Sequence, residues 1–219
     1  MPGRCLLCYI TDRTAFAGDE ATRRRRLLEK IAEGVAAGVG FIQLREKDLT
    51  THELELLARD VVRVISETRQ PNTRLLINSR TDVAIACGAD GVHLRSDDIS
   101  PQEVRKIWNM ADTASRARTT PVVSVSCHTL GEVEQAAKNG ADFVVFAPVF
   151  EKKDATGAHP AGVDALRKAR QLAIPVLALG GVNLENAGHC LDAGAAGIAA
   201  IRLFQDNDIA TIVRKLRDQ

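Results

Sequence analysis

The sequence predicts an α/β protein in which eight parallel strands alternate with helices and close into one barrel, and three observations lead to this prediction. A phrase that begins with glycine and continues with small and apolar residues occurs four times, at residues 38–42, 88–92, 140–144 and 194–198. The spacing of about 50 residues accommodates two compact strand–helix units in each repeat. Short apolar runs of strand length alternate with helix-compatible stretches along the chain. Four repeats of two units predict a (β/α)8, or TIM, barrel, which we expect to occupy residues 1–219 as a single domain.

Each glycine phrase is typical of a helix that ends on a left-handed glycine and leads into a strand buried on both faces. In chain order, the expected strands are residues 5–11, 41–44, 75–78, 91–94, 122–127, 143–149, 176–179 and 197–201. Cap-type residues with an acidic first turn mark three helix starts: Ser100 before Pro101 and Glu103, Thr129 before Glu132, and Asn183 before Glu185. An open, doubly wound sheet is the alternative arrangement of the same alternating elements.

Composition narrows the class of protein without naming a function. The chain is 45% hydrophobic with a net charge of +1, so it can bury a large core and has no global basic field for nucleic acid. The N-terminal apolar segment, residues 5–10, is too short for a signal peptide or a membrane span. We therefore expect a cytoplasmic protein with neither a nucleic-acid nor a membrane partner, while the oligomeric state stays open.

Charged residues follow the second expected strand with a spacing of two. Gln43, Arg45 and Lys47 share one face, whereas Ile42 and Leu44 take the other. Catalytic and binding residues of this fold lie at the C-terminal ends of the strands, so these cations are expected at the barrel mouth. The fork of an arginine beside the point charge of a lysine suits phosphate or carboxylate oxygens. The alternative is an ordinary charged loop after a strand.

The fifth expected strand repeats this pattern. Ser126 and His128 have the parity that faces the barrel axis and its mouth. A histidine there is a natural proton-transfer group, although a helix-capping or hydrogen-bonding role is the alternative, because Thr129 begins the next helix.

Polar residues also end the third and fourth expected strands, at Asn78 and at Asp97–Asp98. The adjacent aspartates either hold Mg²⁺, which accepts one or two carboxylates plus substrate phosphates, or cap the helix at Ser100.

The last two units contain a third kind of signal. Gly180 and Gly181 follow the seventh strand, and Ile201–Arg202 leads from the eighth strand into a short helix-like segment. Glycines allow backbone N–H groups to approach a ligand, and the loops after strands 7 and 8 are the usual phosphate site of this barrel. A phosphorylated small molecule is therefore the expected ligand.

Together these segments resemble the thiamine phosphate synthase and TenI family over nearly the whole chain and in the same order. The resemblance rests on residues 9–12, 43–47, 77–78, 88–94 with Asp97–Asp98, 125–126 with His128, 148–150 and 179–182. It implies a phosphate-binding barrel that handles thiazole or thiamine phosphates.

In that family's synthases, the matching residues have distinct implied roles. Those matching Gln43, Arg45, Lys47 and Asn78 hold the pyrimidine pyrophosphate, one matching Asp98 binds Mg²⁺, one matching Ser126 lies at the pyrimidine, and backbone matching Gly181, Ile201 and Arg202 grips the thiazole phosphate.

Two departures from the synthase pattern favour the TenI-like branch. Ser79 stands where synthases carry a second Mg²⁺ carboxylate, and residues 151–157, with Lys152 and Lys153, replace the synthase Thr-x-Thr-Lys segment. The preferred interpretation is a TenI-like thiazole tautomerase, which moves protons without a cofactor and would use His128 as its acid and base. The alternatives are a Mg²⁺-dependent thiamine phosphate synthase and a non-catalytic thiamine phosphate binding protein.

Overall fold

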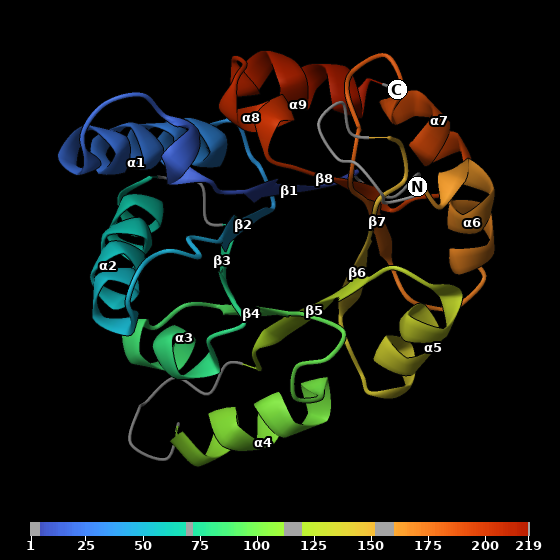
Figure 1. Cartoon of the computed structure of the whole chain (residues 1–219), viewed down its shortest axis with the longest axis horizontal. Helices are drawn as coiled ribbons and strands as arrows, with labels where there is room; N and C mark the ends of the chain where they lie inside the picture. Colours follow the sequence, from blue (N-terminus) through green and yellow to red (C-terminus); the bar gives the residue numbers. More distant parts are fainter. Residues whose placement is uncertain (1–4, 69–71, 112–119, 152–159, 219) are drawn as a thin grey trace.

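The computed structural model describes residues 5–68, 72–111, 120–151 and 160–218, and their strands form a closed parallel barrel. Each strand pairs with the next along the chain, and β8 pairs with β1, as Figure 1 shows in a view along the barrel with the helices outside the ring. This confirms the (β/α)8 prediction and excludes the open sheet, which would leave two unpaired edges.

The strands are β1 Leu6–Ile10, β2 Phe41–Leu44, β3 Arg74–Asn78, β4 Gly91–Leu94, β5 Val122–Cys127, β6 Phe143–Phe146, β7 Val176–Ala178 and β8 Gly197–Ala200. The described helices are η1 Arg13–Ala15, α1 Glu20–Ala36, α2 Thr51–Glu67, α3 Thr81–Cys87, α4 Pro101–Ala111, α5 Leu130–Lys138, α6 Gly162–Ala169, α7 Ala187–Asp192, α8 Arg202–Gln205 and α9 Ile209–Arg217.

The repeated glycine phrases end helices as predicted. Their first glycines have φ values of +81°, +72°, +75° and +91°, at Gly38, Gly88, Gly140 and Gly194. After each glycine, the next backbone N–H donates to a carbonyl five residues earlier, at 3.0 Å. This is the Schellman arrangement, which satisfies helix carbonyls that otherwise lack a partner.

Two expected boundaries were wrong by more than one residue. The sixth strand ends at Phe146 instead of residue 149, because Pro148 has no N–H to donate to a ladder. Asn183 does not begin a helix: its side chain accepts from the N–H groups of Glu185 and Asn186, and α7 starts only at Ala187. Thr129 and Ser100, by contrast, accept from the N–H groups of Glu132 and Glu103 as predicted.

The barrel interior is closed by apolar side chains at the N-terminal ends of the strands. The rings of Phe41 and Phe143 meet there with centroids 4.7 Å apart. Gly91 and Gly197 begin the other two even-numbered strands, and a Cβ at either would lie 1.8 Å from a carbonyl oxygen of the adjacent strand. Two bulky and two absent side chains thus alternate around this layer of the barrel.

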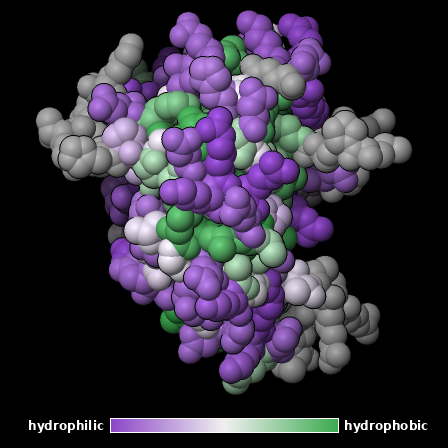
Figure 2. Space-filling view, turned by 90° about the vertical axis from the view of Figure 1, so that its right-hand side faces the viewer, coloured by the Kyte–Doolittle hydropathy of each residue, from purple (hydrophilic) through white to green (hydrophobic). Residues whose placement is uncertain are grey.

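The helices bury one face against the barrel and present polar residues outward. Figure 2, which views the molecule from the side where α6 and α7 lie in Figure 1, shows a mostly hydrophilic surface with a small hydrophobic area. Among the described residues, none of the helices combines the length and the apolar character that crossing a bilayer requires.

Candidate active site

Inside the barrel, the polar side chains gather on β2 to β5. Gln43 points inward from β2, is 1% exposed, and donates from Nε2 to Asn78 Oδ1 on β3 at 2.9 Å. Among the described residues, Gln43 Oε1 is a buried polar atom that lacks a hydrogen-bond partner. An unpaired buried acceptor is costly, so this oxygen is available to a donor on a ligand or a water molecule.

The hydrogen-bond chain continues outward to the predicted metal ligand. Asn78 Nδ2 donates to Ser79 Oγ at 3.3 Å, and Ser79 Oγ donates to Asp98 Oδ2 at 2.7 Å. Ser79 reaches this position with a φ of +56°. Asp98 also accepts from the backbone N–H of Arg95 at 2.8 Å, so it closes the turn before α4, while Ser100 and Glu103 cap that helix. The alternative role of Asp98 as a helix cap was therefore wrong.

A buried histidine joins β4 to β5. The two ring nitrogens of His93 lie 2.8 Å from Ser124 Oγ and 2.8 Å from Ser126 Oγ. Burial, together with the positive charge of Arg45, lowers the pKa of His93 to about 4, although the carboxylate of Asp98 acts in the opposite direction. The ring is therefore neutral at pH 7 and orients Ser126, which the sequence had placed at the site. The inward parity of His93 on its own strand is the signal that could have identified it.

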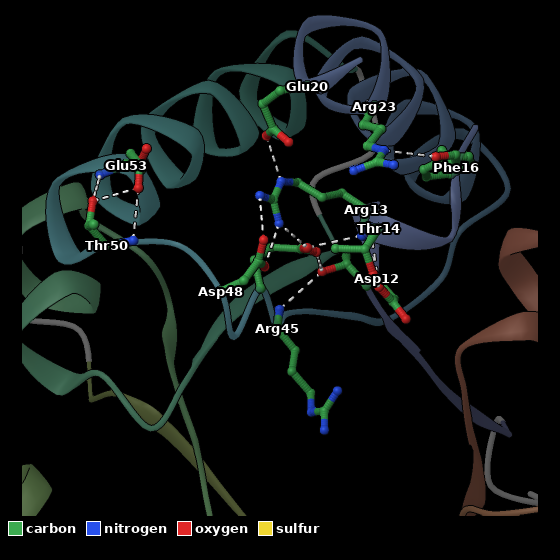
Figure 3. A network of polar contacts seen from close by, with 12 residues as sticks. Asp12, Arg13, Thr14, Phe16, Glu20, Arg23, Arg45, Asp48, Thr50 and Glu53 are labelled. Atoms are coloured by element: carbon green, nitrogen blue, oxygen red, sulfur yellow. Dashed lines mark hydrogen bonds and ion pairs between the residues drawn. The ribbon is translucent and has the colours of Figure 1, made fainter. Parts of the chain in front are cut away.

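Arg45 and Lys47 end β2 at the barrel mouth. In the described residues, neither the Arg45 guanidinium nor the Lys47 ammonium has a hydrogen bond or an ion pair. Figure 3 shows the Arg45 side chain extending away from Arg13, α1 and α2. Arg45 is half-buried and Lys47 is exposed. Two cations that the described residues leave without a partner supply the charges that an anion site would need.

Glu46 faces the opposite way and was missed by the sequence analysis. Its side chain is 1% exposed and accepts from Thr11 Oγ1 at 2.6 Å, from the Arg13 N–H at 2.9 Å and from Arg13 Nη1 at 3.3 Å. Burial raises the pKa of Glu46, an effect that these hydrogen bonds oppose. Arg13, itself 4% exposed, also binds Asp48 and Glu20, and Asp48 above all raises the Arg13 pKa.

His128 lies just after β5, at the rim between β5 and β6. Its Nδ1 donates to the carbonyl of Ala147 at 2.6 Å, and its backbone N–H donates to Glu132. The side chain is exposed. Because Nδ1 is engaged, Nε2 is the nitrogen left for exchange with a ligand or solvent.

The glycine pair after β7 adopts left-handed backbone, with φ values of +96° at Gly180 and +65° at Gly181. A Cβ at Gly181 would lie 2.6 Å from Glu151 O, and one at Gly180 would lie 2.8 Å from Pro148 Cα. The Gly180 carbonyl accepts from the Phe150 N–H at 3.0 Å. The glycines therefore permit close packing against the segment after β6, a reason that the sequence pattern did not reveal.

The structure brings some of the predicted site residues into contact and leaves others apart. The structure joins Gln43, Asn78 and Asp98 through Ser79, and joins Ser126 to His93. Ile201 precedes α8 and Arg202 opens it, so both lie at the end of β8, next to the strand that leads to Gly180 and Gly181. Lys152 and Lys153 lie outside the described residues.

Comparisons with known proteins show which family the chain resembles. A family model described as thiamine monophosphate synthase matches residues 7–204. The chain is 39% identical to a putative thiamine-phosphate synthase of Geobacter sulfurreducens over 198 residues, which cover 89% of this chain and 84% of that protein. It is 35% identical to a thiamine-phosphate synthase of Syntrophomonas wolfei, covering 96% of this chain and 94% of that protein. The solved structure of a thiamine phosphate pyrophosphorylase from Pyrococcus furiosus has a TM-score of 0.78 and 28% identity, covering 99% of this chain and 96% of that one.

Proposed function

The chain belongs to the thiamine monophosphate synthase family, and from this premise we propose that it is a thiamine phosphate synthase, which joins a pyrimidine pyrophosphate to a thiazole phosphate and releases pyrophosphate. The relatives carry synthase names, and these comparisons do not favour the tautomerase expected from Ser79.

The observation that supports the proposal is the pair of cations after β2, Arg45 and Lys47, to whose charged groups the described part of the chain offers no hydrogen bond or ion pair. Departure of pyrophosphate develops negative charge on oxygens, and preorganised cations stabilise that charge most effectively where water is partly excluded. Arg45 offers a planar fork to two oxygens, and Lys47 offers a mobile point charge at the rim. A tautomerase, which only moves protons and grips one phosphate, has no need for this second cationic site.

Gln43, Asn78, His93 and Ser126 form a polar wall inside the barrel, and this wall supplies neutral contacts to a ligand. Gln43 and Asn78 are held by their mutual hydrogen bond, and His93 holds Ser126. Side chains locked by such neighbours bind a planar polar ring with little loss of rotamer freedom. In this proposal, Ser126 contacts the pyrimidine, whereas Gly181, Ile201 and Arg202 take the thiazole phosphate at the ends of β7 and β8.

The donor set at Asp98 fits Mg²⁺ only with help from the substrate. Mg²⁺ takes one or two protein carboxylates together with substrate phosphates, and Asp98 supplies one carboxylate beside the Ser79 hydroxyl. No cluster of three His, Cys, Asp or Glu side chains suited to a metal ion occurs in the described part of the chain. Asp98 and pyrophosphate oxygens would hold the ion, which would neutralise charge on the leaving group. Because Ser79 adds no charge, we expect weak affinity for Mg²⁺ alone.

One observation favours a second candidate, the thiazole tautomerase. His128 is fixed through Nδ1 while its Nε2 is left for proton exchange, which is the arrangement that an acid–base group requires. The carboxylated thiazole phosphate would then be the substrate, and neither Asp98 nor a metal would be needed.

The test is a direct assay of both reactions with purified protein. We expect thiamine phosphate to form from pyrimidine pyrophosphate and thiazole phosphate in the presence of Mg²⁺. Arg45→Ala should lower this rate by about 10²-fold or more, the usual scale for losing one contact to developing charge. Arg25→Ala is the matched control, because Arg25 pairs with Glu29 on the exposed face of α1 and with no other described residue. Tautomerisation without any thiamine phosphate formation would refute the synthase and support the second candidate.

A further inference from the structure

Cations and carboxylates alternate along the segment that follows β2: Arg45, Glu46, Lys47 and Asp48. Without other partners, two carboxylates this close in the chain would compete for the two cations and neutralise the anion site. The structure avoids this competition. Glu46 and Asp48 turn away from the barrel axis, and both bind Arg13 from the loop after β1.

The guanidinium of Arg13 is shared among three carboxylates. Nη1 and Nη2 bind the two oxygens of Asp48 at 2.7 and 2.8 Å, Nη1 also reaches Glu46 at 3.3 Å, and Nε binds Glu20 at 2.6 Å. Figure 3 shows this network under α1 and α2, on the side of the chain opposite the Arg45 side chain. Only a guanidinium presents enough donors in a fixed fork to engage all three acids.

The same network fixes the backbone that carries the cations. Thr11 Oγ1 donates to Glu46 at 2.6 Å and accepts from the Arg45 N–H at 3.0 Å. The segment is therefore attached to the end of β1 at residues 45, 46 and 48, and the side chains left over are those of Arg45 and Lys47.

We propose that Arg13 is a positioning residue for the anion site: by occupying Glu46 and Asp48, it keeps Arg45 and Lys47 available for an anionic ligand. The inference rests on the proposed function, because it takes that ligand to be the pyrophosphate group of the substrate. Arg13 acts through the segment after β2 and does not itself touch the ligand.

The test measures binding of inorganic pyrophosphate with Mg²⁺ by calorimetry in a double-mutant cycle. Arg13→Lys keeps the positive charge beside buried Glu46 but cannot bind all three acids, so Asp48 is released toward Lys47. We expect affinity to fall by about tenfold, a change of about 1.4 kcal/mol. Asp48→Asn should restore most of this affinity in the Arg13→Lys background and change little in the parent, because Asp48 is already engaged there.

Controls separate this role from a structural one. Arg24 lines a cavity together with Arg13 and Asp48 but pairs with Asp60, so Arg24→Gln should leave binding unchanged. In assays of synthesis, Arg13→Lys should raise KM for the pyrimidine pyrophosphate more than it lowers kcat. Thermal unfolding of each variant checks the fold.

Three outcomes would overturn the proposal. Unchanged pyrophosphate affinity in folded Arg13→Lys is the first, and an equal gain from Asp48→Asn in both backgrounds is the second, since that would be a general charge effect. The third is a parent protein whose pyrophosphate binding is absent or indifferent to Arg45→Ala. That result would refute the proposed function as well, whereas the first two leave it standing.

Discussion

Stability should depend on pH through His93, which is buried inside the barrel between two serine hydroxyls. The side chain is 3% exposed, and burial lowers its pKa from 6.5 to about 4. In the unfolded chain the imidazole returns to its ordinary pKa. Between pH 6.5 and pH 4, the unfolded state therefore binds a proton that the folded state does not bind.

The sign and size of the effect follow from this difference. Stability is highest above pH 6.5, where neither state is protonated at this site, and it falls as the pH drops toward 4. The full difference between the two pKa values corresponds to about 3 kcal/mol of unfolding free energy, at roughly 1.4 kcal/mol for each pKa unit. Glu46, whose pKa is raised, contributes with the opposite sign, so the effect of His93 must be isolated by substitution.

The assay is urea unfolding at several pH values between 4 and 8, for the parent and for His93→Asn. We expect the stability difference between the two proteins to shrink by about 3 kcal/mol from pH 7.5 to pH 4. His189→Asn, at an exposed position, controls for removal of a histidine. A parent–variant difference that is constant with pH would refute the argument that His93 is held neutral by burial.

Three further predictions concern the site. Ser79→Asp should tighten Mg²⁺ binding in the presence of pyrophosphate by about tenfold in calorimetry, and weaker binding would show that a carboxylate cannot coordinate from this position. His128→Asn should leave thiamine phosphate formation within a few-fold of the parent, while any tautomerase turnover falls by about 10²- to 10⁴-fold; a large loss of synthesis would place His128 in that reaction instead. Gly181→Ala should lower the melting temperature more than Gly88→Ala. Both substitutions put a side chain on left-handed backbone, but of these two positions only residue 181 has neighbouring atoms within 4 Å of the added Cβ. Equal decreases in melting temperature would contradict this packing.

Local patterns were sufficient for the fold. The glycine phrases predicted four helix ends, because a left-handed residue at a helix terminus is a local requirement that glycine meets most easily. Strand parity predicted the inward position of Gln43 for the same reason, since alternation depends only on neighbouring residues. The expected bounds of β2, β4 and β5 match those in the structure.

Contacts between segments that are far apart in the chain could not be predicted from local sequence patterns. Arg13 and Glu46 are 33 residues apart, and nothing local to either indicates that they meet. His93 and Ser124 are 31 residues apart, and their contact depends on the register between β4 and β5. The end of β6 was mispredicted because of one residue, Pro148. It lies in a continuous apolar run, but it has no N–H to donate to the strand ladder.

The aromatic pair that closes one end of the barrel has a consequence for how ligands enter and leave the site. Phe41 and Phe143 fill the axis where β2 and β6 begin, so, among the described residues, the end of the barrel left for a ligand to enter is the one where the strands end. In the proposed synthase, two substrates would share this entrance, and the one that lies deeper would bind first and leave last. For that reaction, the closed end of the barrel predicts an ordered kinetic pattern, in which the outer substrate and the outer product compete for the same layer.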